Sequence, residues 1–174
     1  RFSLYISLAQ GKTRLHTISK SITRTVKVQR FVQFLRSRVL GGRITEAYQL
    51  QNERIVKLMV LRAEETTLLW IRLWGGAANI IVTEEDGTIL DSFYRRPKRN
   101  EITGGFFHPE SDPSFLPSKK IDQDRFMVRD IPGPESFNRK IEQEYARKET
   151  DERLSGAKEE LNKLISQRES KLQS

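Results

Sequence analysis

Residues 53–94 read ERIVKLMVLRAEETTLLWIRLWGGAANIIVTEEDGTILDSFY and hold four short apolar segments separated by charged or glycine-bearing turns. Their β-branched and large apolar side chains favour β-strands. Asp86-Gly87, between the last two segments, supplies the positive φ angles of a tight hairpin. The order and the short connections predict an antiparallel meander. The expected strands are residues 54–61, 67–74, 78–83 and 88–94.

The residues before this meander predict further elements that pack on it. Residues 2–9 alternate apolar and polar side chains, as a half-buried strand does, and a short strand is expected at 15–18. Residues 28–39 predict a helix that Gly41-Gly42 ends. Residues 43–50 predict one more strand leading into the meander. The apolar positions of the helix are Val28, Phe31, Val32, Leu35 and Val39.

The character of the chain changes after residue 94. Residues 95–134 contain all six prolines, which predicts a linker or loop. Residues 135–174 contain no proline and a single glycine, Gly156, and their apolar residues recur at near-heptad spacing. They predict a long helix that begins one arm of a coiled coil, with the partner strand supplied by the same full-length chain.

The expected fold class is therefore α+β. An antiparallel β-meander sheet carries a short packed helix and is followed by a long C-terminal helix of coiled-coil type. The expected domains are an α+β domain over residues 1–94, the proline-rich linker 95–134, and the start of a helical arm over 135–174. Because the chain begins without Met and within an expected strand, we interpret it as a fragment that lacks N-terminal residues.

The composition of the 174 residues narrows the class of protein. Only 36% are hydrophobic and the mean hydropathy is −0.60, which indicates that part of the chain buries little surface. There is no cysteine, so disulfides and thiolate metal sites are excluded. No apolar run approaches the roughly 20 residues that span a bilayer. We expect a cytoplasmic location or, alternatively, the cell surface.

The net charge of +8 is concentrated at one end of the chain. Residues 1–43 hold ten Lys or Arg and no acidic residue, whereas residues 133–174 hold nine of each sign. A local excess of positive charge suits a polyanion such as RNA or an acidic membrane surface. A solvated basic surface is the alternative interpretation.

Residues suited to catalysis are scarce. The only histidines are His16 and His108, and no phosphate-binding loop is present, so we expect no enzyme, no metal, no cofactor and no small-molecule substrate. Trp70, Arg72 and Trp74 alternate along one expected strand and share one face. The two tryptophans belong either to the core or to a platform on which bases stack.

Two segments resemble a known family. Residues 31–44, FVQFLRSRVLGGRI, followed by NERIV at 52–56, resemble the NFACT-family pattern Phe-x-x-x-Leu-Arg-(Lys/Arg), Gly-Gly-x-Ile and then Asp-Arg-Ile. Residues 74–82, WGGAANIIV, are similar to the Met-Gly-Arg-His-Ser-Asn-Ile-Ile-Leu of that family, with Gly75 and Asn79 as shared motif residues. The order and spacing match over about residues 1–110. Members include the bacterial RqcH type, the eukaryotic nuclear export mediator factor, and fibronectin-binding protein A-like proteins.

The resemblance implies an NFACT N-terminal domain that lacks its first part. It implies binding to tRNA and to the obstructed large ribosomal subunit in ribosome-associated quality control. The Asp-Arg pair of the family engages tRNA, so Glu53 and Arg54 inherit that candidate role. The chain departs from the family at Gly76-Ala77-Ala78, where Arg-His-Ser is usual, and at Arg72, where an acid is usual. The other candidate RNA-binding residues are basic: Lys12, Arg14, Arg36, Arg38, Arg95, Arg96, Lys98 and Arg99.

Two other functions fit the same chain. A surface adhesin of this family would bind fibronectin or another matrix protein, through a free sheet edge or the basic surface. A structural coiled-coil interaction module would act through the long helix alone. RNA binding should weaken steeply with salt, because counterions are released, whereas adhesion should depend on salt more mildly.

Overall fold

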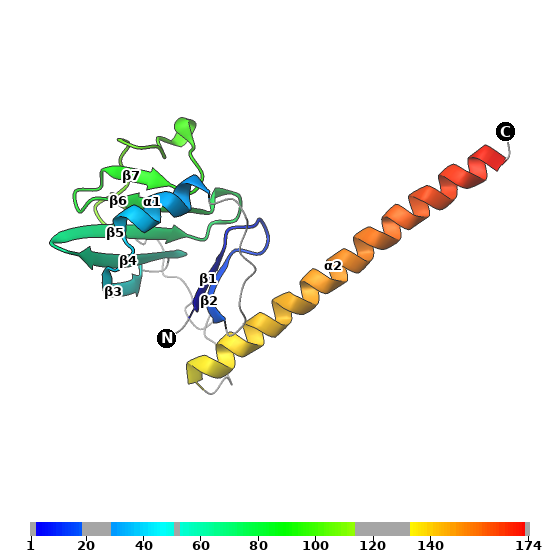
Figure 1. Ribbon diagram of the computed structural model, residues 1–174, viewed down its shortest axis with the longest axis horizontal. Coiled ribbons are helices and arrows are strands. Elements are labelled where there is room, and N and C mark those ends of the chain that lie inside the picture. The colour runs from blue at the N-terminus through cyan, green and yellow to red at the C-terminus, as the bar shows by residue number, and fades with distance from the viewer. Residues whose placement is uncertain (1–2, 19–28, 51–52, 114–132, 173–174) are drawn as a thin grey trace. The chain divides into compact units, whose positions relative to one another are not determined.

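The computed structural model describes residues 3–18, 29–50, 53–113 and 133–172 (Figure 1). These residues divide into two compact units. The larger unit comprises residues 6–15, helix α1 and a five-stranded sheet together with the segment that follows it. The smaller unit comprises residues 3–5 and 16–18 together with helix α2. Each unit is described by itself.

The larger unit is built on an antiparallel sheet with the strand order β3-β4-β5-β6-β7, so the predicted meander is confirmed. Two-residue and longer turns connect its neighbours, and Arg62 pairs with Glu65 across the tightest of them. Ala63 there has a φ of 46°, unusual for a residue with a side chain. The strands are β3 Arg43–Gln49, β4 Ile55–Arg62, β5 Glu65–Arg72, β6 Asn79–Thr83 and β7 Ile89–Ser92.

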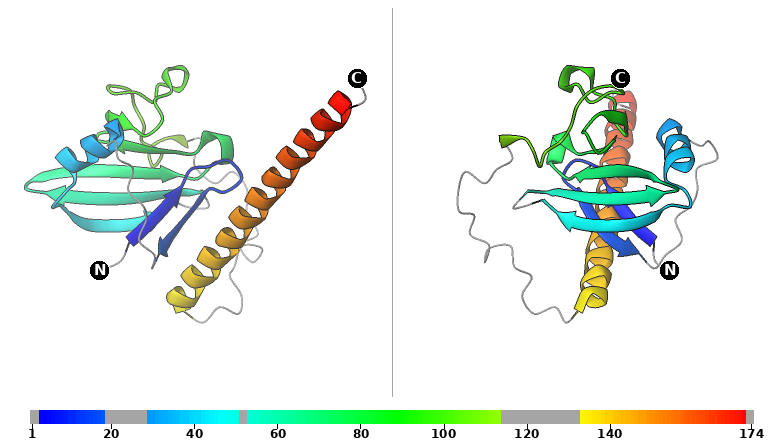
Figure 2. Two further views of the ribbon diagram at one scale, coloured as in Figure 1. Left: turned by 45° about the vertical axis from the view of Figure 1, so that its right-hand side comes forward. Right: turned by 90° about the vertical axis from the view of Figure 1, so that its left-hand side faces the viewer.

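One face of the sheet, the α1 face, is covered by helix α1, Arg30–Arg38 (Figure 2). Phe31 is buried against Ile80 and Val82, and Phe34 packs beside it. The predicted apolar stripe was partly wrong, because Val32 is exposed and Phe34 takes its place. Residues 31, 34 and 35 share one helical face at i, i+3 and i+4 spacing, and this spacing selects the residues that contact the sheet. Of the predicted stripe, residue 28 lies outside the described residues.

The other face, the Trp70 face, packs under residues 95–113. Its buried apolar residues come from four strands, and Phe107 packs on them from above. Residues 104–107 also add to the outer edge of β7, where Gly104 donates to the Ile89 carbonyl at 2.8 Å and Phe107 to the Gly87 carbonyl at 2.9 Å. The buried apolar residues of this face are Ile55, Leu68, Trp70, Ile81 and Ile89.

The predicted linker thus begins as a covering layer of the sheet, and its residues 114–132 lie outside the described residues. It includes a short 3-10 helix, η2 Pro97–Arg99. The domain boundaries at 94 and 134 stay a prediction.

Two buried cations lie on the Trp70 face, and each meets a glutamate of the covering layer. Arg72 donates to Glu101 at 2.6 Å, with both side chains about 5% exposed or less. Lys57 donates to Glu110 at 2.8 Å. Burial lowers the pKa of Arg72, against the hydrogen bond and charge of Glu101. Burial likewise lowers the pKa of Lys57 and raises that of Glu110.

The contacts on the Trp70 face show the role of Trp70, Arg72 and Trp74, which alternate along β5 and just after its end. Trp70 is fully buried and donates its Nε1–H to the Thr83 hydroxyl at 3.0 Å. Trp74 is partly buried against the same core cluster, and the Arg72 guanidinium lies 5.1 Å from its ring centroid. Both tryptophans therefore belong to the core, and Trp70 and Arg72 offer no exposed platform for bases.

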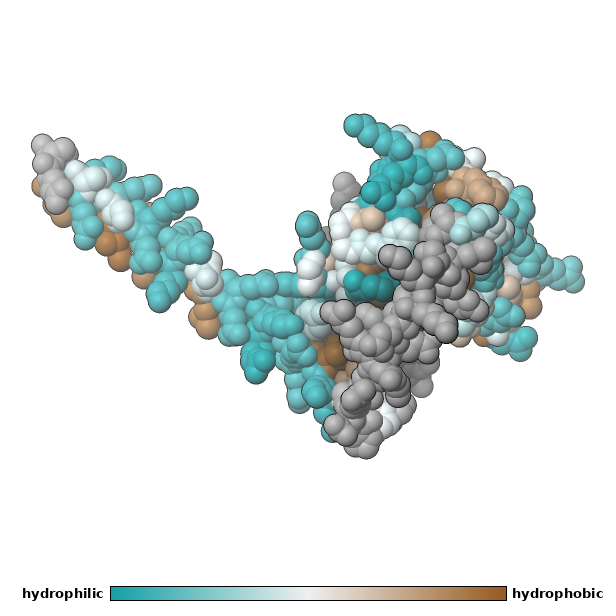
Figure 3. Space-filling view, turned by 180° about the vertical axis from the view of Figure 1, so that it is seen from behind, coloured by the Kyte–Doolittle hydropathy of each residue, from teal (hydrophilic) through white to brown (hydrophobic). Residues whose placement is uncertain are grey.

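The smaller unit holds the long helix α2, Gly133–Leu172. Strands β1 Ser3–Ser7 and β2 Arg14–Ile18 form a separate two-stranded sheet, and the Thr17 amide donates to the Asn138 side chain at 2.8 Å. Exposed apolar side chains follow the C-terminal half of α2 (Figure 3), an arrangement compatible with a coiled coil. They are Leu154, Leu161, Leu164, Ile165 and Leu172.

Together the sheet, the packed helix and the long helix confirm the α+β fold class. Among the residues that the structure describes, no helix combines the length and the hydropathy needed to cross a membrane.

Candidate nucleic-acid interface at one end of the sheet

The candidate interface lies at the end of the sheet where β4 begins and β5 ends. Ile55 and Arg72 pair across these strands, so the residues just outside them, Arg54 and Leu73, are neighbours. The Leu73 amide donates to the Arg54 carbonyl at 2.7 Å. This bond fixes the backbone of Arg54 although its side chain is exposed.

The tip of the β1–β2 hairpin meets Arg54 at this end. Arg54 Nη2 donates to the Thr13 hydroxyl at 2.9 Å and to the Thr13 carbonyl at 3.4 Å. The Thr13 hydroxyl in turn donates to the Leu73 carbonyl at 3.4 Å. Lys12 and Arg14 flank Thr13, and Arg14 donates to the Lys12 carbonyl at 3.0 Å. Three of the predicted cations, from two distant parts of the sequence, are thereby brought together.

The turn between β5 and β6 forms the next part of this end. It contains the 3-10 helix η1, Gly75–Ala77, and Gly75 has a φ of 39°. Arg96 reaches this turn and donates to the carbonyls of Gly76 at 3.3 Å and Ala78 at 3.1 Å. Gly75 thus serves the conformation of the turn, and Arg96 joins the basic residues at this end.

Asn79, the second motif residue, is fully buried directly after this turn. Its Nδ2 donates to the Tyr94 carbonyl at 2.9 Å and to Glu101 at 2.7 Å, and its Oδ1 accepts from the Tyr94 amide at 2.9 Å. These bonds join β6 to the covering layer. Asn79 therefore holds the layer that carries Arg96, and its side chain does not reach solvent.

Lys98 and Arg99 are exposed in η2, in the same layer. Burial lowers the pKa of Arg72, and the charges of Arg96 and Arg99 act in the same direction. Glu53 is half-buried, and its carbonyl accepts a bond from Gln49 at 2.8 Å.

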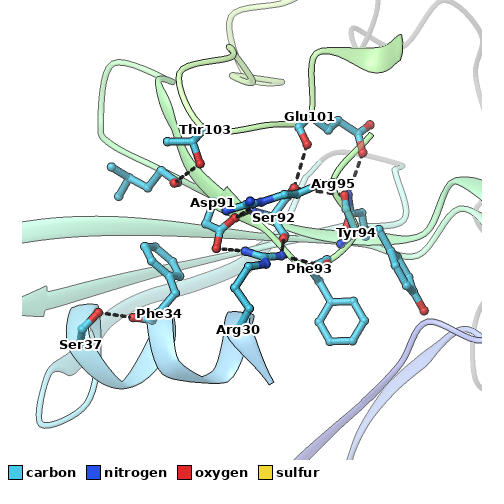
Figure 4. A network of polar contacts seen from close by, with 12 residues as sticks. Arg30, Phe34, Ser37, Asp91, Ser92, Phe93, Tyr94, Arg95, Glu101 and Thr103 are labelled. Carbon is cyan, nitrogen blue, oxygen red and sulfur yellow. Dashed lines mark hydrogen bonds and ion pairs between the residues drawn. The ribbon is translucent and has the colours of Figure 1, made fainter. Parts of the chain in front are cut away.

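The structure places the other predicted cations elsewhere. Arg95 approaches Asp91 at 3.3 Å, and Arg30 of α1 reaches the same carboxylate (Figure 4). Arg38 lies by the opposite end of the sheet, 3.0 Å from Glu65 and 3.2 Å from Glu84. Arg36 is exposed on α1. Lys98 and Arg99 lie exposed in η2, outside the group that the contacts gather. That group is Lys12, Arg14, Arg54 and Arg96, and we call it the sheet-end cluster.

Sequence reasoning missed Thr13 and Glu101, on which the sheet-end cluster depends. Thr13 bonds Arg54, and Glu101 anchors the covering layer through Arg72 and Asn79. These partners lie between 22 and 41 residues apart in the chain, so no local pattern connects them. Over the described ranges, no three acidic or histidine side chains are grouped as metal ligands would be.

The sequence profile of the family described as NFACT N-terminal and middle domains matches residues 1–103, more than half of the chain. A comparison with curated protein sequences gave no match. Among solved structures, the N-terminal domain of fibronectin-binding protein PavA from Streptococcus pneumoniae is similar, with a TM-score of 0.57 and 19% identity over 87% of this chain and 66% of that one.

Two further structures share the fold. The N-terminal part of the fibronectin/fibrinogen-binding protein of Streptococcus suis has a TM-score of 0.57 and 18% identity, over 71% of this chain and 56% of that one. The fibrinogen-binding protein of Staphylococcus aureus has a TM-score of 0.52 and 20% identity, over 62% of this chain and 39% of that one. The chain thus spans less than two thirds of the length of each of these structures.

Proposed function

Since the chain belongs to the NFACT family, we propose that it is the RNA-binding part of a ribosome-associated quality-control factor. It engages tRNA and the obstructed large ribosomal subunit in the cytoplasm. The observation that supports this proposal best is the bonding of Arg54 to the hairpin tip, which gathers Arg54, Lys12 and Arg14 at one end of the sheet.

The chemistry of the sheet-end cluster suits a phosphate backbone. Arg offers a planar fork of N–H donors that grips phosphate oxygens in pairs, and Lys adds a compact charge. The cluster draws two of its four cations, Lys12 and Arg14, from the first 43 residues, which lack acidic side chains altogether. Binding of this kind is non-catalytic and needs no cofactor, so we propose that the chain is not an enzyme.

The first test measures the affinity of the full-length protein for labelled bulk tRNA as salt rises from about 50 to about 200 mM. We expect Arg54→Ala to weaken binding about tenfold, because one charge-assisted contact is lost. The slope of log affinity against log salt should also fall by about one. Tight binding of wild-type protein that Arg54→Ala leaves unchanged would contradict the proposal.

Arg43→Ala is the matched control. Arg43 is an exposed residue at the start of β3, and it pairs with Leu61 at the opposite end of the sheet from Arg54. Its replacement removes the same charge away from the sheet-end cluster. An equal loss of affinity in both variants would indicate a diffuse effect of net charge instead of a defined interface.

A second candidate function is fibronectin binding at the cell surface. Two of the similar structures carry fibronectin-binding in their names. In this chain the seven residues of β3 are all exposed, and among the described strands β3 pairs only with β4. Such an edge can accept a partner strand. The Leu50 amide donates to the Ile55 carbonyl at 2.9 Å. Hydrogen-bonded pairs alternate along an antiparallel ladder, so the Ala47–Leu58 pair falls at an unbonded position and the Ala47 N–H points outward. Ala47→Pro should therefore weaken fibronectin binding without removing a bond to β4.

One experiment distinguishes the two candidate functions, tRNA binding and fibronectin binding. Immobilised fibronectin and labelled tRNA are offered to wild type, Arg54→Ala and Ala47→Pro. Loss of tRNA binding in Arg54→Ala alone supports the ribosomal role. Loss of fibronectin binding in Ala47→Pro, without any tRNA binding by wild type, supports adhesion. Binding to neither would leave the exposed leucines of α2 as support for a coiled-coil interaction module.

A further inference from the structure

We infer that Thr13 is a positioning residue for Arg54 in RNA binding, an inference that rests on the function proposed above. Arg54 lies just outside β4, and its side chain is exposed. A long exposed arginine samples many rotamers, and fixing it on binding costs entropy. The hairpin tip supplies the contacts that orient this guanidinium before RNA arrives.

Three hydrogen bonds connect Thr13, Arg54 and Leu73 in a closed ring. Arg54 Nη2 donates to the Thr13 hydroxyl at 2.9 Å, and that hydroxyl donates to the Leu73 carbonyl at 3.4 Å. The Leu73 amide completes the ring by donating to the Arg54 carbonyl at 2.7 Å. The Thr13 hydroxyl acts as donor and acceptor at once, so a hydroxyl is required at this position.

The hydrogen bonds of this ring leave other N–H groups of the Arg54 guanidinium available to a ligand. Within the described part of the chain, both side-chain bonds of Arg54 use Nη2, and its Nε–H and Nη1–H groups are not engaged. Those groups point to different sides of the guanidinium, so each can donate to a separate phosphate oxygen. Thr13 therefore holds Nη2 of Arg54 while Nε–H and Nη1–H stay available to a ligand, and it keeps Lys12 and Arg14 beside Arg54.

Thr13→Val tests this assignment, because valine keeps the shape of threonine and removes the hydroxyl. We expect tRNA affinity to fall about fivefold, the effect of one ordinary hydrogen bond. Thr13→Ser keeps the hydroxyl and should bind within about twofold of wild type. Thr45→Val is the matched control, since the Thr45 hydroxyl of β3 donates to the Met59 carbonyl of β4, away from this cluster, and its loss should leave the affinity unchanged.

A double-mutant cycle separates positioning from an independent contact. If Thr13 acts through Arg54, then Thr13→Val has no further effect in the Arg54→Ala background. Equal losses in both backgrounds would overturn the inference. So would an unchanged affinity in Thr13→Val when Arg54→Ala is weakened, and this result leaves the proposed function standing. An unchanged affinity in Arg54→Ala overturns both.

A readout without RNA completes the test. The NMR relaxation of the Arg54 Nε–H reports its motion, and it should become more mobile in Thr13→Val but not in Thr13→Ser. Thermal unfolding of all variants checks that the hairpin and sheet are intact. Equal mobility of the Arg54 Nε–H in wild type and Thr13→Val would contradict the positioning role.

Discussion

The five-stranded sheet and helix α2 obtain their stability in different ways. In the sheet the ion pair Arg72–Glu101 joins residues 29 positions apart and is almost entirely buried. In α2 the pair Glu144–Lys148 joins residues four positions apart and is exposed. Interactions of the first kind exist only after the chain has folded, whereas those of the second kind form within a single helix. A substitution should therefore have a large effect in the sheet and a small, local effect in α2.

The largest effect is expected from Glu101→Ala, which leaves Arg72 buried without its carboxylate and Asn79 without one acceptor. The free energy of unfolding of the larger unit should fall by about 4 kcal/mol, the usual cost of breaking a buried ion pair. Denaturant unfolding followed by tryptophan fluorescence measures it.

Replacing both charges should recover most of this loss, because apolar residues of similar volume often match a buried pair in stability. The double variant Arg72→Met/Glu101→Leu serves as the control. A loss below about 1 kcal/mol in Glu101→Ala would show that water reaches Arg72, and the contrast between sheet and helix would be weaker than the contacts indicate.

The second effect concerns the α1 face. Phe31→Ala should reduce the free energy of unfolding by about 3 kcal/mol, because it empties the space between α1 and the sheet. Val32→Ala, one position along the same helix, removes an exposed side chain and should change stability by less than about 0.5 kcal/mol. Similar losses of unfolding free energy in the two variants would mean that α1 does not pack on the sheet through the face that contains Phe31.

The third effect is local to α2. Gly156 lies inside the helix, and an added methyl group would meet no atom within 4 Å. Gly156→Ala should stabilise the helix by about 1 kcal/mol, the difference in intrinsic helix propensity. Far-UV circular dichroism should show greater helix content, while the denaturant midpoint of the sheet stays unchanged. A shifted midpoint of the sheet would contradict the separation of local from long-range stability.

The smallest expected effect is a pH dependence of the stability of helix α2. The hydrogen bond from Lys148, at 2.8 Å, lowers the pKa of Glu144, and the same bond raises the pKa of Lys148. The pair therefore contributes to helix stability at neutral pH. The contribution is lost as pH falls through the lowered pKa of Glu144, and again as pH rises through the raised pKa of Lys148.

Glu144→Gln isolates this contribution. The wild-type helix should exceed the variant in helicity at about pH 7 and match it in acid below the lowered pKa of Glu144, where both side chains at position 144 are neutral. Circular dichroism at both pH values measures the difference. A difference that persists in acid would have to come from another source than this pair.

Much of the fold was predictable from the sequence, because strands and helices follow local periodicity. Asp86-Gly87 placed a hairpin correctly: Gly87 has a φ of 92°, and the Thr88 amide donates to Asp86 at 2.8 Å. The turn at Ala63 carries neither Gly nor Asn, so the expected start of β5 lay two residues too late. The choice between Val32 and Phe34 depended on which residues α1 meets, and the helix alone does not contain that information.

The candidate site was predictable only in part. The excess of basic residues and the resemblance around Arg54 pointed to the residue types, since charge and motif are properties of the sequence itself. Which cations gather was decided by contacts: Arg54 meets the hairpin tip at Thr13, whereas Arg95 turns to Asp91. The role of these residues in RNA binding stays a prediction until the tRNA measurements are made.

The sequence by itself determined the α+β class, the antiparallel meander and the long polar helix, because each depends on residues that lie close together in the chain. Only the tertiary structure decided that the residues after β7 cover the Trp70 face, that Arg72 is buried against Glu101, and that Thr13 holds Arg54. These are pairings between distant residues. Their geometry is set when the hairpin, the sheet and the covering layer pack together, since only then do the partners come within bonding distance.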